Sequence, residues 1–312
     1  MRKVTKPTGT YMSERPILQE FPQVDYDKAS GKLGEIYEDI QNTLRVPWVA
    51  FAIRVMSQFE HFVPEAWAAL RSQISTRYAE EGADRIREGS IVPGPAPADP
   101  TPQLLANGVT EGEIKKLKAT LDALTYGNPK YLILITAWNE AWHERNAGGR
   151  SEKPLQGRQS ELLPYRLPRG VEKFHLVDIE SAGERVQRTL RDLRDASLHH
   201  GSASDYRVLA AWPDYLEIAL KDALQPVALT AEYEETARQI RKIAREHIRG
   251  FDKVGGVAWR DLTDKLSPEQ IAGMTGLLFM YNRFIADITI AVIRLKQAFG
   301  GAADATENKF PV

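Results

Sequence analysis

The 312-residue sequence lacks cysteine, which excludes disulfide bonds, thiolate catalysis and zinc or iron–sulfur centres with cysteine ligands. It also lacks an excess of charge of either sign, because 41 basic residues face 42 acidic ones and no basic block stands out. This balance gives no reason to expect a nucleic-acid partner.

Long apolar runs are missing as well. The start of the chain, MRKVTKPTGTYMSERP, has no apolar core of the kind that a secretory signal needs. The longest apolar run, around Met274–Met280, is short for a bilayer span, and Arg283 and Asp287 interrupt the residues after it. We therefore expect a cytoplasmic protein without a membrane partner.

Several sequence motifs of well-known site types are also missing. No GxGxxG dinucleotide loop, GxxxxGK[ST] phosphate loop, GxSxG nucleophile turn or His-Glu-x-x-His metal motif occurs. The six histidines lack metal-ligand spacing, and the neighbours His199 and His200 would point to different sides of a helix. The sequence therefore predicts neither a metal nor a cofactor.

Helical periodicity is what the sequence does contain, as in the apolar face of residues 33–44. A Ser-Pro-Glu-Gln start signal at Ser267 opens the last and longest helical segment. No alternating strand pattern or hairpin signal appears, so the fold should be all-α. The further helical segments that we expect cover residues 64–78, 111–124, 131–142, 181–198, 206–211, 215–224, 232–248 and 267–299.

The two halves of the chain resemble each other. Residues 58–63 match residues 211–216 at an offset of 153, and residues 124–128 match residues 279–283 at an offset of 155. A nearly constant offset predicts two duplicated helical repeats packed as an intramolecular pseudo-dimer. The expected parts are a disordered lead-in at 1–20, a first repeat at 21–146, a linker at 147–169 and a second repeat at 170–312.

The repeat brings two unlike pairs of residues to equivalent places. At the offset of 153, Phe51 corresponds to Ser204 and Ala52 corresponds to Asp205. A site between the repeats would therefore have one apolar wall and one polar wall. Such a site suits a small acid with a hydrophobic or halogenated end.

Asp205 and Asn128 each have two interpretations from the residues alone. Ser202 to Asp205 match a Ser-x-x-acid capping box, but a carboxylate held there could also be a general base. Asn128 precedes Pro129, so it could cap a helix that begins at the proline, or it could hold a water molecule.

Other candidates also have ordinary structural interpretations. Trp48 and Phe51 could be core aromatics that follow Pro47. Thr76 and Glu80 share one face of a helix, which could simply be an exposed polar face. Arg283 and Asp287, also four residues apart, are expected to form a partly buried ion pair.

The chain resembles the group I 2-haloacid dehalogenases, which hydrolyse D- or both D- and L-2-haloalkanoic acids. The resemblance extends from about residue 21 to the end, apart from the linker. It is carried by YEDIQNTLRVPWVAF (37–51), TRYAE (76–80), YGNPKYLILITA (126–137), HHGSASDY (199–206) and GLLFMYNRFIADITI (276–290).

The resemblance implies roles for individual residues. Asp205 matches the aspartate that activates water, and Asn128 matches the asparagine that helps to hold that water. Ala203 matches a position where a small residue accompanies acceptance of both enantiomers. Thr76 and Glu80 match a polar pair implicated in activity. The remaining substrate-lining positions are Trp48, Phe51, Tyr131, Ser204 and Tyr281.

Three functional hypotheses are compatible with these residues. In the first, water attacks C2 of either enantiomer directly, releases halide and inverts the configuration without a cofactor. In the second, the same reaction proceeds through an ester on Asp205. In the third, the chain is a non-catalytic helical protein that binds small hydrophobic acids. A homodimer is a further expectation from the resemblance.

Overall fold

The computed structural model describes residues 23–145, 157–199, 201–252 and 254–312, and all its regular elements in these ranges are helices. The all-α prediction is therefore confirmed for this part of the chain, whereas the lead-in expected at 1–20 lies outside it. The helices are α1 (Gly31–Leu44), α2 (Phe51–Met56), α3 (Phe62–Ile74), α4 (Arg77–Glu88), α5 (Thr101–Ala106), α6 (Glu111–Trp142), η1 (Gly157–Ser160), α7 (Glu184–Ser197), α8 (Ser204–Leu209), α9 (Pro213–Ile218), η2 (Ala219–Leu224), α10 (Ala231–Ile248), η3 (Trp259–Leu262) and α11 (Pro268–Thr306).

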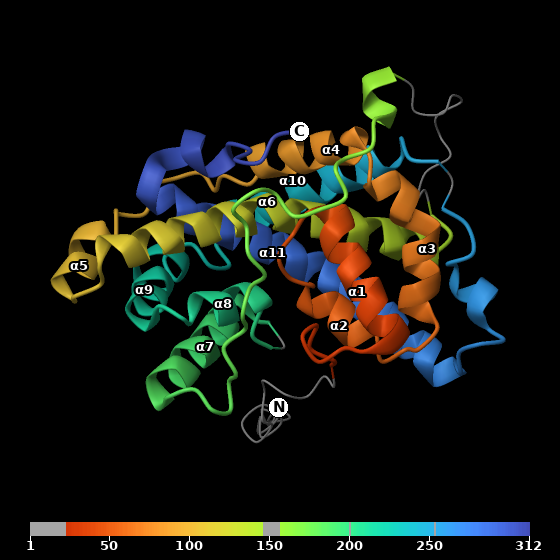
Figure 1. Cartoon of the computed structure of the whole chain (residues 1–312), viewed down its shortest axis with the longest axis horizontal. Coiled ribbons are helices and arrows are strands. Elements are labelled where there is room, and N and C mark those ends of the chain that lie inside the picture. The colour runs from red at the N-terminus through yellow and green to blue at the C-terminus, as the bar shows by residue number, and fades with distance from the viewer. Residues whose placement is uncertain (1–22, 146–156, 200, 253) are drawn as a thin grey trace, which may run out of the picture.

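The two longest helices, α6 and α11, run through the middle of the molecule (Figure 1). Both begin with a capping box, in which Thr110 pairs with Glu113 and Ser267 pairs with Gln270. Their apolar side chains form much of the core, and each fully buried leucine or isoleucine contributes about 1.5–3 kcal/mol. The helices therefore provide a rigid centre on which shorter helices rest.

One sequence prediction about this centre is wrong. We expected residues 127–129 to divide two helices, but α6 continues from Glu111 to Trp142 with Pro129 inside it. A proline in a helix interior removes the hydrogen bond to the carbonyl four residues earlier, here that of Thr125. The Arg87 Nε donates to the Thr125 oxygen instead, over 3.1 Å, and this replacement partner compensates for the missing amide hydrogen.

Helices of equal length recur at one offset. α1 and α7 cover 31–44 and 184–197, and α2 and α8 cover 51–56 and 204–209, so both pairs lie 153 residues apart. The helix caps agree too, since Arg45 and Leu198 are both left-handed and Ala50 and Ala203 have nearly the same φ and ψ. In Figure 1, α1 to α3 lie toward the right end of the two long helices, and α7 to α9 lie toward the left end.

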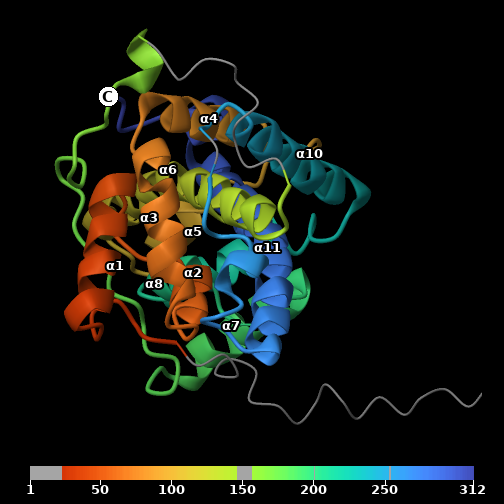
Figure 2. The ribbon, with the colours of Figure 1, turned by 90° about the vertical axis from the view of Figure 1, so that its right-hand side faces the viewer.

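The helices α4 and α10 lie side by side along one edge in both views (Figures 1 and 2). Each begins at a threonine whose side chain accepts from a backbone amide, Thr76 in α4 and Thr230 in α10. The described end of the predicted linker attaches to the same edge. Leu163 N donates to Ser75 O over 2.8 Å, and Arg77 N donates to Glu161 O over 2.8 Å.

Length and composition would allow α11 to cross a membrane, although we judged the apolar run within it too short. Of its most apolar 18-residue window, 72% is buried inside the protein. Asn282 and Thr136 form a 2.8 Å hydrogen bond between α11 and α6. These contacts are those of a core helix.

The predicted pair of Arg283 and Asp287 also forms, over 3.1 Å, with Asp287 buried.

Candidate active site

Asp205 lies near the start of the short helix α8, and only 4% of it is exposed. The capping interpretation of this stretch is wrong, because Ala203 is the N-cap residue and no side chain caps the helix. Ser202 lies outside the helix, and its buried Oγ has no hydrogen-bond partner among the described residues. The carboxyl of Asp205 is therefore not the distal member of a capping box.

Asn128 contacts Asp205 directly, although 77 residues separate them in the sequence. Its Nδ2 donates to the Asp205 Oδ1 over 2.6 Å and to the Leu124 carbonyl over 3.0 Å. Asn128 is thus in the interior of α6 and does not cap a helix, which corrects the structural alternative. The side-chain amide nitrogen of Asn128 carries two hydrogens, and these two contacts use both of them. The Oδ1 of Asn128 remains as a hydrogen-bond acceptor.

Burial determines the acidity of this carboxyl group. It raises the pKa of Asp205 from 3.8 to about 6, while the hydrogen bond from Asn128 and the charge of Arg54 oppose the increase. At neutral pH the group is therefore still a carboxylate, and its pKa lies nearer to the working pH than that of an exposed aspartate, as general-base catalysis requires. A proton taken from water can be held there and later released.

Trp48 and Tyr131 form one aromatic side of the site. Tyr131, one turn after Asn128 on α6, donates from its hydroxyl to the Trp48 carbonyl over 2.5 Å, and the two ring centres lie 5.5 Å apart. Trp48 also stacks on Phe174 at 5.6 Å. Gly127 makes this packing possible, because a Cβ at that position would collide with the Trp48 ring.

Phe51 and Tyr281 form a second aromatic contact, with ring centres 5.9 Å apart in an edge-to-face arrangement. Phe284 packs against both rings. The Tyr281 hydroxyl is buried and has no hydrogen-bond partner within the described ranges. Ala203 and Ser204, which directly precede Asp205 in the sequence, are both buried. The Ser204 Oγ accepts from the Arg54 Nη2 over 3.2 Å.

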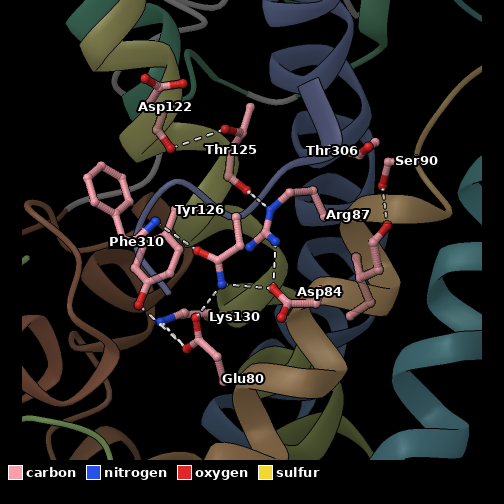
Figure 3. Close-up of polar contacts among 12 residues, drawn as sticks. Glu80, Asp84, Arg87, Ser90, Asp122, Thr125, Tyr126, Lys130, Thr306 and Phe310 are labelled. Atoms are coloured by element: carbon pink, nitrogen blue, oxygen red, sulfur yellow. Dashed lines mark hydrogen bonds and ion pairs between the residues drawn. The ribbon is translucent and has the colours of Figure 1, made fainter. Parts of the chain in front are cut away.

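The predicted pair of Thr76 and Glu80 is buried, so the exposed-face alternative is wrong. Thr76 caps α4 by accepting from Ala79 N over 3.3 Å. Glu80 forms an ion pair with Lys130 (Figure 3), in which the carboxylate oxygen lies 2.6 Å from the Nζ. Glu80 also accepts from the Asn308 Nδ2 over 3.1 Å. Glu80 therefore links α4 to Lys130 on α6 and to Asn308 near the C-terminus. The described contacts of Thr76 and Glu80 do not include Asp205.

The Lys130 ammonium is buried together with Glu80. It lies 3.6 Å from the centre of the Tyr126 ring and donates to the Leu44 carbonyl over 3.0 Å. Burial lowers the pKa of Lys130 to about 8, and Glu80 opposes that decrease. Burial alone would raise the pKa of Glu80, but Lys130 holds it below its usual value. Because Lys130 is two residues after Asn128, this ion pair fixes α6 beside the site.

Sequence reasoning missed three residues here, namely Arg54, Phe174 and Phe284. Arg54 follows Phe51 by three residues, and helical periodicity could have placed both in one short helix. Phe174 lies at the start of the second half, outside the resembling stretches, and no local pattern marked it. Within the described ranges, no cluster of three or more His, Asp or Glu side chains could hold a metal ion.

Comparisons with known proteins identify the family of the chain. The profile described as "Halocarboxylic acid dehydrogenase DehI" matches residues 47–205, a range that includes Trp48, Asn128 and Asp205. A "2-haloacid dehalogenase, configuration-inverting" of Pseudomonas sp. (strain 113) is 73% identical over 96% of this chain and 98% of its own length. One of Alcaligenes xylosoxydans xylosoxydans is 43% identical over 94% and 98%.

A solved structure has the same fold. The complex of D-2-haloacid dehalogenase with L-LA superposes with a TM-score of 0.82 at 25% identity, over 89% of this chain and 96% of that one. The shared fold and the curated relatives identify a helical hydrolase. The chain belongs to the DehI family of 2-haloacid dehalogenases, which act on carbon–halide bonds.

Proposed function

We propose that this enzyme hydrolyses short 2-haloalkanoic acids of either configuration to 2-hydroxy acids, with inversion at C2. Water attacks directly, and no ester forms on the protein. The observation that carries the proposal is the 2.6 Å contact between Asn128 and Asp205, a carboxyl that burial poises with a pKa of about 6.

The free acceptors of the two side chains define how water binds. One hydrogen of the water donates to the Asn128 Oδ1, because both hydrogens of Nδ2 are already used. The other hydrogen donates to the Asp205 carboxylate, which leaves an oxygen lone pair for C2. As the new C–O bond forms, the C–halogen bond breaks, halide leaves with its electron pair and Asp205 takes the proton.

The aromatic side chains supply the remainder of the catalysis. A positioned base contributes on the order of 10²–10⁴ in rate, so orientation of C2 against the water must add to it. The rings of Trp48, Phe51, Tyr131 and Tyr281 surround a substrate with an apolar halogenated end and restrict its poses.

Acceptance of both enantiomers requires two poses that present opposite faces of C2 to the same water. Ala203 leaves room for this because its side chain is a single methyl group. The names of the relatives support the wider range. Those at 73% and 43% identity carry no restriction to one enantiomer, whereas a relative of Pseudomonas putida at 30% identity is called an (R)-2-haloacid dehalogenase.

The chain organisation that we propose is two duplicated repeats, with the site formed where they meet. The recurrence of α1 and α2 as α7 and α8 at an offset of 153 supports this organisation. In this arrangement, Phe51 opens α2 as Ser204 opens α8, which gives the site its unlike walls. A homodimer and a cytoplasmic location remain predictions.

Two alternatives differ from this proposal. An ester on Asp205 would give the same products, and labelled water separates the two routes. A binding protein without activity fits poorly with membership in a family of dehalogenases.

The reaction itself is tested with separate (R)- and (S)-2-chloropropionate, by halide release and chiral analysis of the lactate. We expect both to react, with (R) giving (S)-lactate and (S) giving (R)-lactate. Retention of configuration would contradict direct attack, and reaction of a single enantiomer would contradict the proposed range.

A further inference from the structure

Two arginines at equivalent places in the repeat meet at one carboxylate. Arg54 is the fourth residue of α2 and Arg207 is the fourth residue of α8. Their Nη1 atoms lie 3.2 Å and 3.6 Å from the same oxygen, the Oδ1 of Asp25. Asp25, whose side chain is 22% exposed, is therefore shared by the two arginines.

The two arginines differ in their other contacts. The Arg207 Nε donates to the Val177 carbonyl over 3.0 Å, away from the catalytic pair. The Arg54 Nη2 donates to the Ser204 Oγ over 3.2 Å, next to Asp205 in the sequence, and its Nε has no acceptor among the described residues. The Arg54 side chain is 0% exposed. A buried cation with an unused donor is costly unless an anion compensates it.

Arg54 also lies beside the aromatic lining of the site. Its guanidinium carbon is 5.9 Å from the centre of the Phe51 ring, which itself packs on Tyr281. Burial lowers the pKa of Arg54 to about 10, so the group remains a cation at neutral pH. The positive charge is therefore present whenever Asp205 is ready to act as a base.

Electrostatics makes such a cation necessary if the proposed function holds. A 2-haloacid enters as a carboxylate, and it must approach the buried carboxylate of Asp205. Two like charges in a poorly solvated site repel strongly. The described contacts of Asn128 neutralise neither charge, because its amide is uncharged.

We infer, on the basis of the proposed function, that Arg54 is the positioning residue that makes the site select anionic acids. Ser204 Oγ accepts from Arg54, so its own hydroxyl hydrogen is free to donate to the substrate carboxylate. The charge of Arg54 strengthens that donor and offsets the repulsion from Asp205. Neutral amides of the same shape gain nothing from this arrangement.

The test compares binding of propionate and propionamide, two unreactive probes of nearly equal shape, by titration calorimetry. The variants are R54Q, R54K and the matched control R207Q, which removes the equivalent arginine from the same Asp25. In R54Q, propionate affinity should fall at least about tenfold, which corresponds to the loss of one charged hydrogen bond. Propionamide affinity should change little. R54K should recover part of the propionate affinity.

The control separates recognition from a structural role. R207Q should lower the melting temperature without changing the preference for propionate over propionamide. If R54Q weakens both probes equally, or if R207Q removes the preference as R54Q does, Arg54 only supports the fold and the inference is wrong. Halide release by the unaltered enzyme, measured separately, shows whether the proposed function itself fails.

Discussion

Asp205 should limit the stability of the folded protein while it makes the reaction possible. Its pKa is 3.8 in an exposed reference state and about 6 in the fold. Because the folded state holds the proton more tightly, stability is lost as the pH rises from about 4 to about 6, and the full loss is present above pH 6. A pKa difference of this size corresponds to about 3 kcal/mol at neutral pH.

Replacing Asp205 by asparagine removes this cost. The new amide oxygen can still accept from the Asn128 Nδ2, so the 2.6 Å contact has a replacement. We expect D205N to release no halide and to unfold with a free energy higher by up to about 3 kcal/mol at pH 8. The gain should shrink as the pH falls through 6 and should be small near pH 4, where Asp205 itself is protonated.

The assay is urea unfolding at pH 8, 6 and 4.5, followed by circular dichroism, together with halide release from 2-chloropropionate. D122N is the matched control, because Asp122 lies 2.7 Å from the buried Lys296 and its loss leaves that ammonium uncompensated. D122N should lower stability. A D205N protein that is no more stable than the original at pH 8, or that still releases halide, would refute the reasoning.

Three further predictions concern the pH profile, a buried ion pair and the packing at a glycine. Since Asp205 must be ionised, kcat/KM should fall about tenfold per pH unit below pH 6, and a profile that stays level to pH 4 would exclude this base. E80Q should cost about 3–5 kcal/mol in urea unfolding because it leaves the Lys130 ammonium buried without its partner, and an unchanged stability would show that the pair contributes little. G127A should displace the Trp48 ring and lower kcat/KM for 2-chloropropionate at least about tenfold, whereas the exposed-site control G112A should not.

Local sequence patterns predicted most of the helices, because capping and periodicity depend on neighbouring residues. The start at Ser267 is an example, since its capping box forms as expected. Pro129 shows the limit of this reasoning. Its local signal is that of a helix boundary, but the helix continues because Arg87, 42 residues earlier, supplies the missing donor. A contact of that range has no signature in the local sequence.

The candidate site was predicted unevenly for the same reason. The resemblance identified Asp205 and Asn128, and the structure brings them together. Helical spacing predicted one helix for Thr76 and Glu80, but α4 begins at Arg77 and Thr76 is its extended N-cap residue. The spacing also could not show that Glu80 would pair with Lys130 in the interior. Arg54 has no distinguishing pattern of its own. Its importance appears only when α2 and α8 lie close enough to share Asp25.

The central claim is that water, and not Asp205, forms the new bond to C2. A single turnover in ¹⁸O-labelled water, with enzyme in excess over 2-chloropropionate, tests this claim most directly. Direct attack predicts label in the lactate of the first turnover and none in the protein. Unlabelled lactate from that first turnover, followed by label in the Asp205 carboxylate, would contradict the account and establish the ester route.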